Sequence, residues 1–341
     1  MRAESGKRIL MVVPSGRGGV YTVVDAIARV LRSSGHRVDV ACQDFGVSRT
    51  AARFNLDRMP PYPGQDYDVV WFHARAIACA ANCRIRATFI AHWHGFDACV
   101  AAAARTDVGR GHLAALPGLV MASRDAELVA RGAAACTRNV AVSQGVRDEV
   151  VAHLGCECSV LPNWFVTSAK RREPSQDRGS GRELRIVVVG GRGWRKGLWV
   201  MMQACGQRDG RPFRVTVFDG GKVRDVRLGA SVVAFRGLTA HASLLREMEM
   251  ADVYLSSSLY EGMSLGLVDA VAIGLPVVVS NVNGVQEAVD RNGWVVPVGD
   301  VGALKRVLGS VATWDRQRLF ALGRREMPQV DVVGEVGALL R

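Results

Sequence analysis

The chain has 341 residues, of which 49% are hydrophobic and 22% charged, and its formal net charge is +12. This length accommodates two domains with cores of their own, and the composition excludes a disordered chain. Its uncharged apolar runs are far shorter than the roughly 20 residues that a membrane-spanning helix requires. The basic residues lack the aromatic interleaving of single-strand binders and the spacing of zinc fingers, so we expect no nucleic-acid partner.

Short apolar runs alternate with helix-length segments along the chain, a pattern typical of parallel sheets covered by helices. The first run, residues 9–13, ends at Pro14 and is too short for the core of a signal peptide. It predicts a buried strand and a cytoplasmic protein. An amphipathic helix over residues 20–33 follows and ends at Gly35. Strands of the first half are expected at residues 9–13, 37–41, 67–72, 88–92, 140–143 and 159–161.

A polar segment divides the chain into two halves. From Thr167 to Glu183 the sequence TSAKRREPSQDRGSGRE is rich in Pro, Gly, Ser and charge, which indicates a solvated linker. We expect an N-terminal Rossmann-like domain over 1–165, a C-terminal Rossmann-like domain over 166–325, and a helix over 326–341 that returns toward the first domain. Strands of the second half are expected at residues 184–189, 214–218, 232–235, 253–256, 276–280 and 293–296.

The first of three glycine-bearing turns lies between the first strand and its helix, in VVPSGRGGVYTVV. Gly18 and Gly19 let the backbone approach a ligand closely at a helix start. The turn does not fit the dinucleotide pattern G-x-G-x-x-G, because Tyr21 stands where the third glycine belongs. A dehydrogenase is therefore disfavoured, whereas a tight strand-to-helix turn without any ligand explains the glycines equally well.

The second turn, GGRGWRKG, follows the first strand of the second half and carries Arg192, Arg195 and Lys196. Cations at the carboxyl edge of a sheet can neutralise a diphosphate whose charge grows as a leaving group departs. A solvated basic turn is the alternative, because basic loops are frequent on so cationic a chain.

The third turn, LYEGMSLGLVDAVAIGLPVVVSN, has one carboxylate before a helix and another within it. Backbone N–H groups of residues 263–266 would lie at the helix start, where phosphate or sugar hydroxyls can bind. Glu261 would then bind a sugar, and Asp269 would accept hydrogen bonds from the two vicinal hydroxyls of a ribose. Alternatively, Asp269 only stabilises the start of the helix through its dipole.

In this order the motifs resemble the retaining GT-B glycosyltransferases of family 4, which transfer a sugar from a nucleotide diphosphate. The resemblance implies an α/β, GT-B fold in which two Rossmann-like domains face each other across a central cleft. It also implies that neither a metal nor a cofactor takes part, and no D-x-D motif follows a strand. The segments that carry it are GRGGVYTVVDAIARVLRSSGHRVDV, VAVSQGVRDEVVAHLG with VLPN, GGRGWRKG, and ADVYLSSSLYEGMSLGLVDAVAIGLPVVVSNVNGVQEAV.

The resemblance assigns roles to individual residues. Family members carry two glutamates separated by seven residues, and here Glu261 occupies the first place and is implied to be catalytic. Asp269, one methylene shorter than glutamate, occupies the second place. The spacing from Arg192 to Lys196 is one residue shorter than in the family. The implied donor-binding residues are Gly18, Gly19, Arg192, Lys196, Gly262, Met263, Ser264, Leu265 and Asp269.

A histidine-bearing loop, FIAHWHGFDA, resembles the loop that faces the transferred sugar in this family. His94, before Gly95, matches better than His92, and the resemblance makes His94 the second catalytic residue. It would donate a hydrogen bond to a hydroxyl of the donor sugar. A histidine that is satisfied at a strand end, without a role in the reaction, is the alternative.

The leading interpretation is a retaining hexosyltransferase that moves a sugar from a nucleotide-sugar, with UDP-sugars favoured, to a glycan or lipid-linked acceptor. We expect it to build lipopolysaccharide or another surface polysaccharide. Arg49, Arg53 and Arg58, beside Phe54 and Leu56, could make peripheral contact with the inner face of an anionic membrane, or form an ordinary solvated face. A sugar-nucleotide epimerase, a phosphorylase and a non-catalytic nucleotide-sugar sensor are the alternatives.

Overall fold

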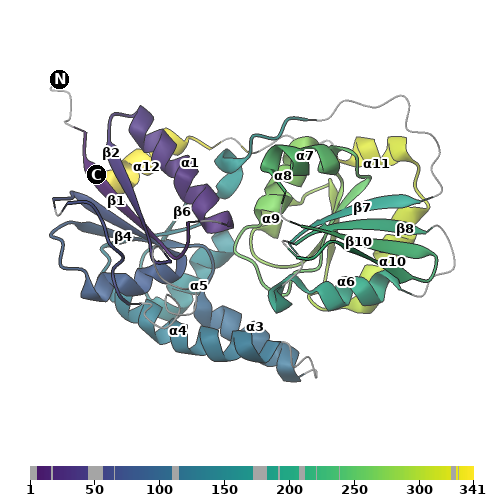
Figure 1. The fold of residues 1–341 in the computed structure, drawn as a ribbon, viewed down its shortest axis with the longest axis horizontal. Coiled ribbons are helices and arrows are strands. Elements are labelled where there is room, and N and C mark those ends of the chain that lie inside the picture. Colours follow the sequence, from purple (N-terminus) through teal and green to yellow (C-terminus); the bar gives the residue numbers. More distant parts are fainter. Residues whose placement is uncertain are drawn as a thin grey trace. The chain divides into compact units, whose positions relative to one another are not determined.

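The chain folds into two compact units (Figure 1). Unit 1 comprises Met1–Val166 and Gln329–Arg341, and unit 2 comprises Thr167–Pro328. The computed structural model describes residues 6–16, 18–44, 57–64, 66–109, 115–171, 183–190, 193–206, 212–219, 221–237, 239–323, 328 and 330–341.

Three features predicted from the sequence fall outside the described residues. They are the greater part of the linker, residues 172–182, the donor-binding candidate Arg192, and the basic positions Arg49 and Arg53 with their apolar neighbours. Their roles stay predictions.

Unit 1 is built on one parallel sheet. Its strands are β1 (Arg8–Val13), β2 (Arg37–Cys42), β3 (Val69–His73), β4 (Thr88–Trp93), β5 (Arg138–Ala141) and β6 (Ser159–Val160). Its helices are α1 (Gly19–Ser33), η1 (Ala74–Asn82), α3 (Asp97–Gly109), α4 (Leu116–Ala134), α5 (Gln144–Leu154), η3 (Asn163–Val166) and α12 (Val332–Leu340). The strand order is β2-β1-β3-β4-β5-β6. Figure 1 shows α1 and α12 over one face of this sheet, with α3, α4 and α5 over the other.

Helix α1 shows how the sequence sets these layers. Val23, Ile27 and Leu31 recur every four residues and are buried, so they form the stripe that faces the core. Gly35 has a φ of 87°. Its N–H bonds to the carbonyl of Arg32 at 3.1 Å, while the next N–H bonds to the carbonyl of Leu31 at 3.0 Å. This Schellman motif ends the helix and turns the chain into β2.

Helix α12 belongs to unit 1 although it lies at the far end of the chain. The ammonium of Lys7 donates a hydrogen bond to the carbonyl of Leu340, and Nη1 of Arg138 donates to the carbonyl of Leu339 at 2.5 Å. Cations that bond the last carbonyls of a helix also favour its dipole. Unit 1 is thus assembled from two segments that are distant in sequence.

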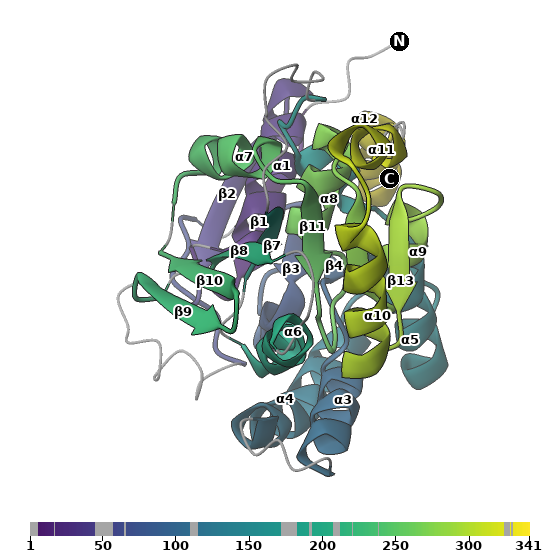
Figure 2. The ribbon, with the colours of Figure 1, turned by 90° about the vertical axis from the view of Figure 1, so that its right-hand side faces the viewer.

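Unit 2 is also an α/β unit. Its strands are β7 (Leu184–Val189), β8 (Phe213–Phe218), β9 (Arg224–Leu228), β10 (Ser231–Arg236), β11 (Val253–Ser256), β12 (Val277–Ser280) and β13 (Gly293–Val296). Its helices are η4 (Trp194–Lys196), α6 (Leu198–Cys205), α7 (His241–Glu249), α8 (Leu265–Ile273), α9 (Val285–Ala288), α10 (Val301–Ala312) and α11 (Arg316–Leu322). The strand order is β13-β12-β11-β7-β8-β10-β9, parallel except for the edge pair β10–β9 visible in Figure 2.

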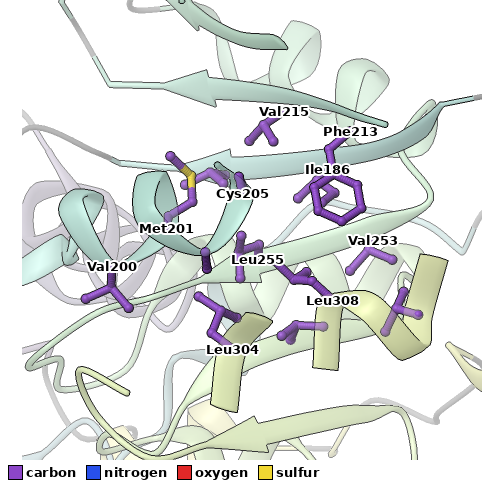
Figure 3. Packing of buried hydrophobic residues seen from close by; sticks show 14 of the residues in the cluster. Ile186, Val200, Met201, Cys205, Phe213, Val215, Val253, Leu255, Leu304 and Leu308 are labelled. Atoms are coloured by element: carbon purple, nitrogen blue, oxygen red, sulfur yellow. The ribbon is translucent and has the colours of Figure 1, made fainter. Parts of the chain in front are cut away.

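The core of unit 2 lies between its sheet and the helices α6 and α10. Val200 and Met201 of α6 and Leu304 and Leu308 of α10 are at most 1% exposed. Figure 3 shows them packed with side chains of the strands. The strand residues labelled there are Ile186, Phe213, Val215, Val253 and Leu255. Because this core fixes β7 and β11, it also positions the turns that follow them.

The structure confirms the predicted alternation of strands and helices, although the strand predicted at 67–72 is Val69–His73 and the helix predicted at 326–341 is Val332–Leu340. The strand predicted at 140–143 is Arg138–Ala141, because Ser143 is the N-cap of α5 and accepts a hydrogen bond from the N–H of Val146. Strand β9 was not predicted, because its sequence RDVRL is charged and largely solvent-facing. Among the helices that the structure describes, none has both the length and the apolar character of a membrane span.

Candidate active site

The predicted basic turn and the predicted carboxylate turn lie side by side in unit 2. They follow β7 and β11, which are neighbouring parallel strands. The N–H of Leu259 donates a hydrogen bond to the carbonyl of Arg195 at 2.6 Å, so the two turns are joined directly. The carboxyl ends of parallel strands are the edge at which α/β proteins bind ligands.

Lys196 and Glu261 form an ion pair at this edge. The Nζ of Lys196 lies 2.5 Å from Oε1 of Glu261, and the hydroxyl of Ser258 donates to the same oxygen at 3.3 Å. Burial by itself would raise the pKa of Glu261, but the charges of Lys196 and Arg195 and the hydrogen bonds from Lys196 and Ser258 lower it overall. Glu261, 12% exposed, is therefore an anion at neutral pH.

Two glycines shape the basic turn around Lys196. Gly197 has a φ of 59°, and a Cβ there would lie 1.9 Å from the carbonyl oxygen of Ser257. The hydroxyl of Ser257 also donates to the carbonyl of Gly197 at 2.9 Å. Gly190 has a φ of 81°, and a Cβ there would lie 3.0 Å from Cε of Lys196. The glycines thus permit the backbone geometry and leave room for the lysine stem.

The start of α8 has its predicted position after Glu261. Ser264 is the N-cap and Leu265 the first helical residue, with the candidates Gly262 and Met263 just before them. The first N–H groups of a helix lack intrahelical partners and favour an anion. A Cβ on Gly266 would lie 2.9 Å from Cβ of Val189, so the glycine lets the first turn of α8 pack against the end of β7.

Asp269, the candidate for the ribose, is 5% exposed and already has two partners. The hydroxyl of Thr167 donates to Oδ1 at 2.5 Å, and Nε2 of His241 lies 2.8 Å from Oδ2. The side chain of His241 is 46% exposed. A ribose at this carboxylate would therefore share its oxygens with Thr167 and His241, and the imidazole is the more accessible of these groups.

The glycine turn of unit 1 is held by an aspartate at the end of β2. The hydroxyl of Ser15 donates to Oδ2 of Asp44 at 2.7 Å, and the N–H of Gly16 donates to Oδ1 at 3.1 Å. Gly18 has a φ of 91° and precedes Gly19, the first residue of α1. A Cβ on Gly18 would meet no atom within 4 Å, so the described residues leave this position open to a ligand.

His94 lies in a cluster with His73 and His92 in unit 1. His73 ends β3 and is paired with His92 of β4 across the sheet. The Nδ1 of His73 lies 3.4 Å from Nε2 of His94, and the rings of His92 and His94 have centroids 4.5 Å apart. Burial lowers the pKa of all three imidazoles, that of His94 to about 3, so they are neutral at pH 7.

Among the predicted site residues the structure brings Lys196 and Glu261 into contact, and it adds partners that sequence reasoning missed. Those partners are Asp44, His73, Thr167, His241 and Ser258. The sequence did contain a signal for His73, because this histidine follows the predicted strand 67–72 as His94 follows the predicted strand 88–92. None marked Thr167 or His241, whose contacts with Asp269 depend on how distant segments pack.

Comparison with known proteins identifies the family. The family model described as glycosyl transferases group 1 matches residues 183–313, and the model described as glycosyltransferase family 4 matches residues 17–168. Together these ranges take up most of the chain. The chain belongs to the group 1 glycosyltransferases.

Two curated relatives are similar to parts of this group 1 glycosyltransferase. The amylovoran biosynthesis glycosyltransferase AmsK of Erwinia amylovora is 32% identical over 143 residues, which cover 37% of this chain and 35% of AmsK. WcaL of Escherichia coli K12, named for colanic acid biosynthesis, is 28% identical over 179 residues, covering 47% of this chain and 44% of WcaL. The chain thus matches less than half of the length of these relatives.

Solved structures confirm the GT-B fold. Sucrose-phosphate synthase from Thermosynechococcus elongatus superposes with a TM-score of 0.67 at 15% identity and covers 98% of this chain and 95% of its own. Anabaena HepE, solved with UDP and glucose, gives 0.63 at 15% identity, with 98% and 99% covered. At this identity the likeness shows the fold, two Rossmann-like domains, and no more.

Proposed function

We propose that this group 1 glycosyltransferase transfers a hexose from a nucleotide diphosphate sugar to a hydroxyl acceptor, with retention of configuration. The observation that carries the proposal is the Lys196–Glu261 pair beside the start of α8. One sheet edge thereby offers a cation, a carboxylate and a helix N-terminus. The names of AmsK and WcaL support a surface polysaccharide as the product, and the UDP and glucose bound by HepE support a UDP-sugar as the donor.

The diphosphate is the group whose charge the protein has to stabilise. As the bond from the anomeric carbon to the diphosphate breaks, negative charge grows on the leaving oxygen. Lys196 and the N–H groups at the start of α8 stabilise this charge, each charge-assisted hydrogen bond contributing roughly 1.5–3 kcal/mol. In this mechanism side chains and a helix do the charge work that a metal ion does in other transferases.

The remaining residues orient the sugar and the nucleotide. Glu261 accepts a hydrogen bond from a sugar hydroxyl, His94 donates one, and Asp269 with His241 holds the ribose. The acceptor oxygen bonds to the anomeric carbon on the face that the diphosphate leaves, and the departing phosphate oxygen takes the acceptor proton. Configuration is retained because both bonds are on one face.

A donor screen tests the proposed activity. The protein is incubated with UDP-, GDP- and ADP-sugars and a lipid-linked acceptor, and nucleoside diphosphate release and the anomeric configuration of the product are measured. We expect release with a UDP-sugar and a product with the configuration of the donor. Conversion of the donor to its epimer without transfer would indicate an epimerase, and tight binding without turnover would indicate a sensor. An inverted product would contradict retention.

A further inference from the structure

The histidine cluster of unit 1 contains more imidazoles than the proposed transfer uses. Only His94 has a role in that reaction, yet His73 and His92 converge on it from neighbouring strands. One ring nitrogen from each of the three residues lies within 4.8 Å of those of the other two. Three convergent imidazoles are a donor set that binds metal ions.

The distances in the cluster approach those of a tetrahedral site. A Zn²⁺ ion bonds imidazole nitrogen at about 2.0–2.1 Å, which places two such nitrogens about 3.4 Å apart. The Nδ1 of His73 and Nε2 of His94 are 3.4 Å apart. The ring centroids are separated by 4.9 Å for His73 and His92, 4.5 Å for His92 and His94, and 5.7 Å for His73 and His94. The three nitrogens lie within 4.8 Å of one another, so the third has to move by up to about 1.4 Å to complete the site.

Buried ring nitrogens in the cluster lack partners. Within the described part of the chain, Nε2 of His73 and both ring nitrogens of His92 are buried and make no hydrogen bond. Both side chains are fully buried. A buried polar atom without a partner is costly, and a bound cation would give a partner to the lone-pair nitrogen of His92, although not to Nε2 of His73, whose Nδ1 is the atom near His94.

The backbone and a tryptophan fix the orientation of the rings. Ala74, directly after His73, has a φ of 51° and is the single non-glycine residue with a positive φ among those described. Strain of this kind persists where the surroundings hold it and is concentrated at functional sites. The ring of Trp71 stacks on His73 with centroids 5.6 Å apart and lies 5.8 Å from His92. Two ligands thus lie on strands, the third directly follows β4, and the ring of Trp71 packs beside His73 and His92.

We propose that His73, His92 and His94 bind one Zn²⁺ ion as three ligands of a tetrahedral site with an open fourth position. Imidazole ligands suit Zn²⁺, whereas Mg²⁺ and Mn²⁺ prefer oxygen, so this site is separate from the handling of the diphosphate. Coordination through Nε2 would leave the proton of His94 on Nδ1, which can still donate to a sugar hydroxyl. The proposal does not depend on the transferase activity, because its readout is metal binding.

The test uses the full chain without an affinity tag. The protein is stripped with a chelator, dialysed, and titrated with Zn²⁺ by calorimetry and with Co²⁺ by visible absorption. We expect one ion per chain and the intense absorption bands of tetrahedral Co²⁺. His94 is the least buried of the three histidines, so His94→Ala is the variant to measure. It should raise the Kd for Zn²⁺ by more than about 100-fold, whereas the loss of an outer-shell partner weakens metal affinity only about 10- to 100-fold.

A matched control variant shows whether the change in Kd is specific to the histidine cluster. His153→Ala removes an exposed imidazole of α5 and should leave the Kd for Zn²⁺ unchanged. If His94→Ala fails to fold, the Co²⁺ spectrum of the wild-type chain still decides, because octahedral or absent bands exclude the site. Less than about one tenth of an equivalent of bound Zn²⁺ in the wild type, or a Kd that His94→Ala leaves unaltered, would overturn the proposal.

Discussion

Glu261 is the residue on which the proposed transfer depends most directly. Glu261→Gln keeps the shape of the side chain and removes the charge that faces Lys196. We expect transfer to fall by about 100- to 1,000-fold, the scale of losing one group that stabilises a transition state. The Kd for UDP should stay the same or decrease, because Lys196 is released to the diphosphate. Glu247→Gln, an exposed change on α7, is the control for both measurements, and wild-type turnover in Glu261→Gln would remove the residue from the site.

The same ion pair predicts how stability responds to acid. The pKa of Glu261 is lower in the folded chain than its ordinary value, so the unfolded state binds more protons between the two values. The contribution of the pair is complete above the unfolded pKa of about 4.3 and is lost as the pH falls through the folded value. The difference in unfolding free energy between wild type and Glu261→Gln should shrink from about pH 6 to about pH 3 in urea titrations. A constant difference would show that the pair contributes nothing.

Asp269 has two possible roles: it binds the ribose of the donor, or it only anchors Thr167 and His241 through hydrogen bonds. In the first case Asp269→Ala raises the Kd for UDP about tenfold, as expected for one lost charge-assisted hydrogen bond. His241→Ala leaves the carboxylate in place and separates the two roles. If His241 only positions Asp269, its removal changes the melting temperature more than the Kd. A lower melting temperature with an unaltered Kd for UDP in Asp269→Ala would make this aspartate structural.

At the scale of elements, the junction between η4 and α6 depends on a glycine that packs closely against the turn after β11. Gly197→Ala places a Cβ in a left-handed backbone and also against the carbonyl of Ser257. Gly229→Ala is the control, because its φ of 61° imposes the same backbone strain while its Cβ would meet no atom within 4 Å. Strain alone costs about 1–2 kcal/mol. Chemical denaturation should therefore show a larger loss for Gly197→Ala, and UDP binding should weaken in this variant only. Equal losses would mean that the close approach to Ser257 is unimportant.

The elements also show what the sequence could reveal. The buried strands and α1 were predictable, because apolar runs and four-residue spacing follow directly from burial. The positions of Glu261 and Lys196 after strands were predictable for the same reason, whereas their roles rest on the family resemblance and stay predictions. The contacts of Asp269 were not, because α7 reaches α8 through tertiary packing that leaves no local pattern. Strand β9 was missed because a charged edge strand resembles a loop in composition.

At the scale of the whole molecule, the functional candidates are divided between the two units. Gly18, Gly19 and His94 belong to unit 1, whereas Lys196, Glu261 and the start of α8 belong to unit 2. The net charge of +12 favours anionic ligands such as nucleoside diphosphates. A measurement of ligand binding along the entire chain can therefore test the proposed binding of the nucleoside diphosphate and the proposed Zn²⁺ site in one experiment.

Hydrogen–deuterium exchange of the whole chain makes this measurement. UDP with EDTA present should slow amide exchange over residues 193–198 and at the start of α8, and at Gly18 and Gly19 if their backbone contacts the diphosphate. Zn²⁺ alone should slow exchange around His73 and over 92–96 and leave α8 unchanged. At 100 times its Kd a ligand adds about 2.7 kcal/mol to the stability of the unit that binds it, so amides that exchange through unfolding of that unit should slow about 100-fold. Protection by UDP that appears only with Mg²⁺ or Mn²⁺ would contradict the assignment of the diphosphate charge to Lys196 and the helix start.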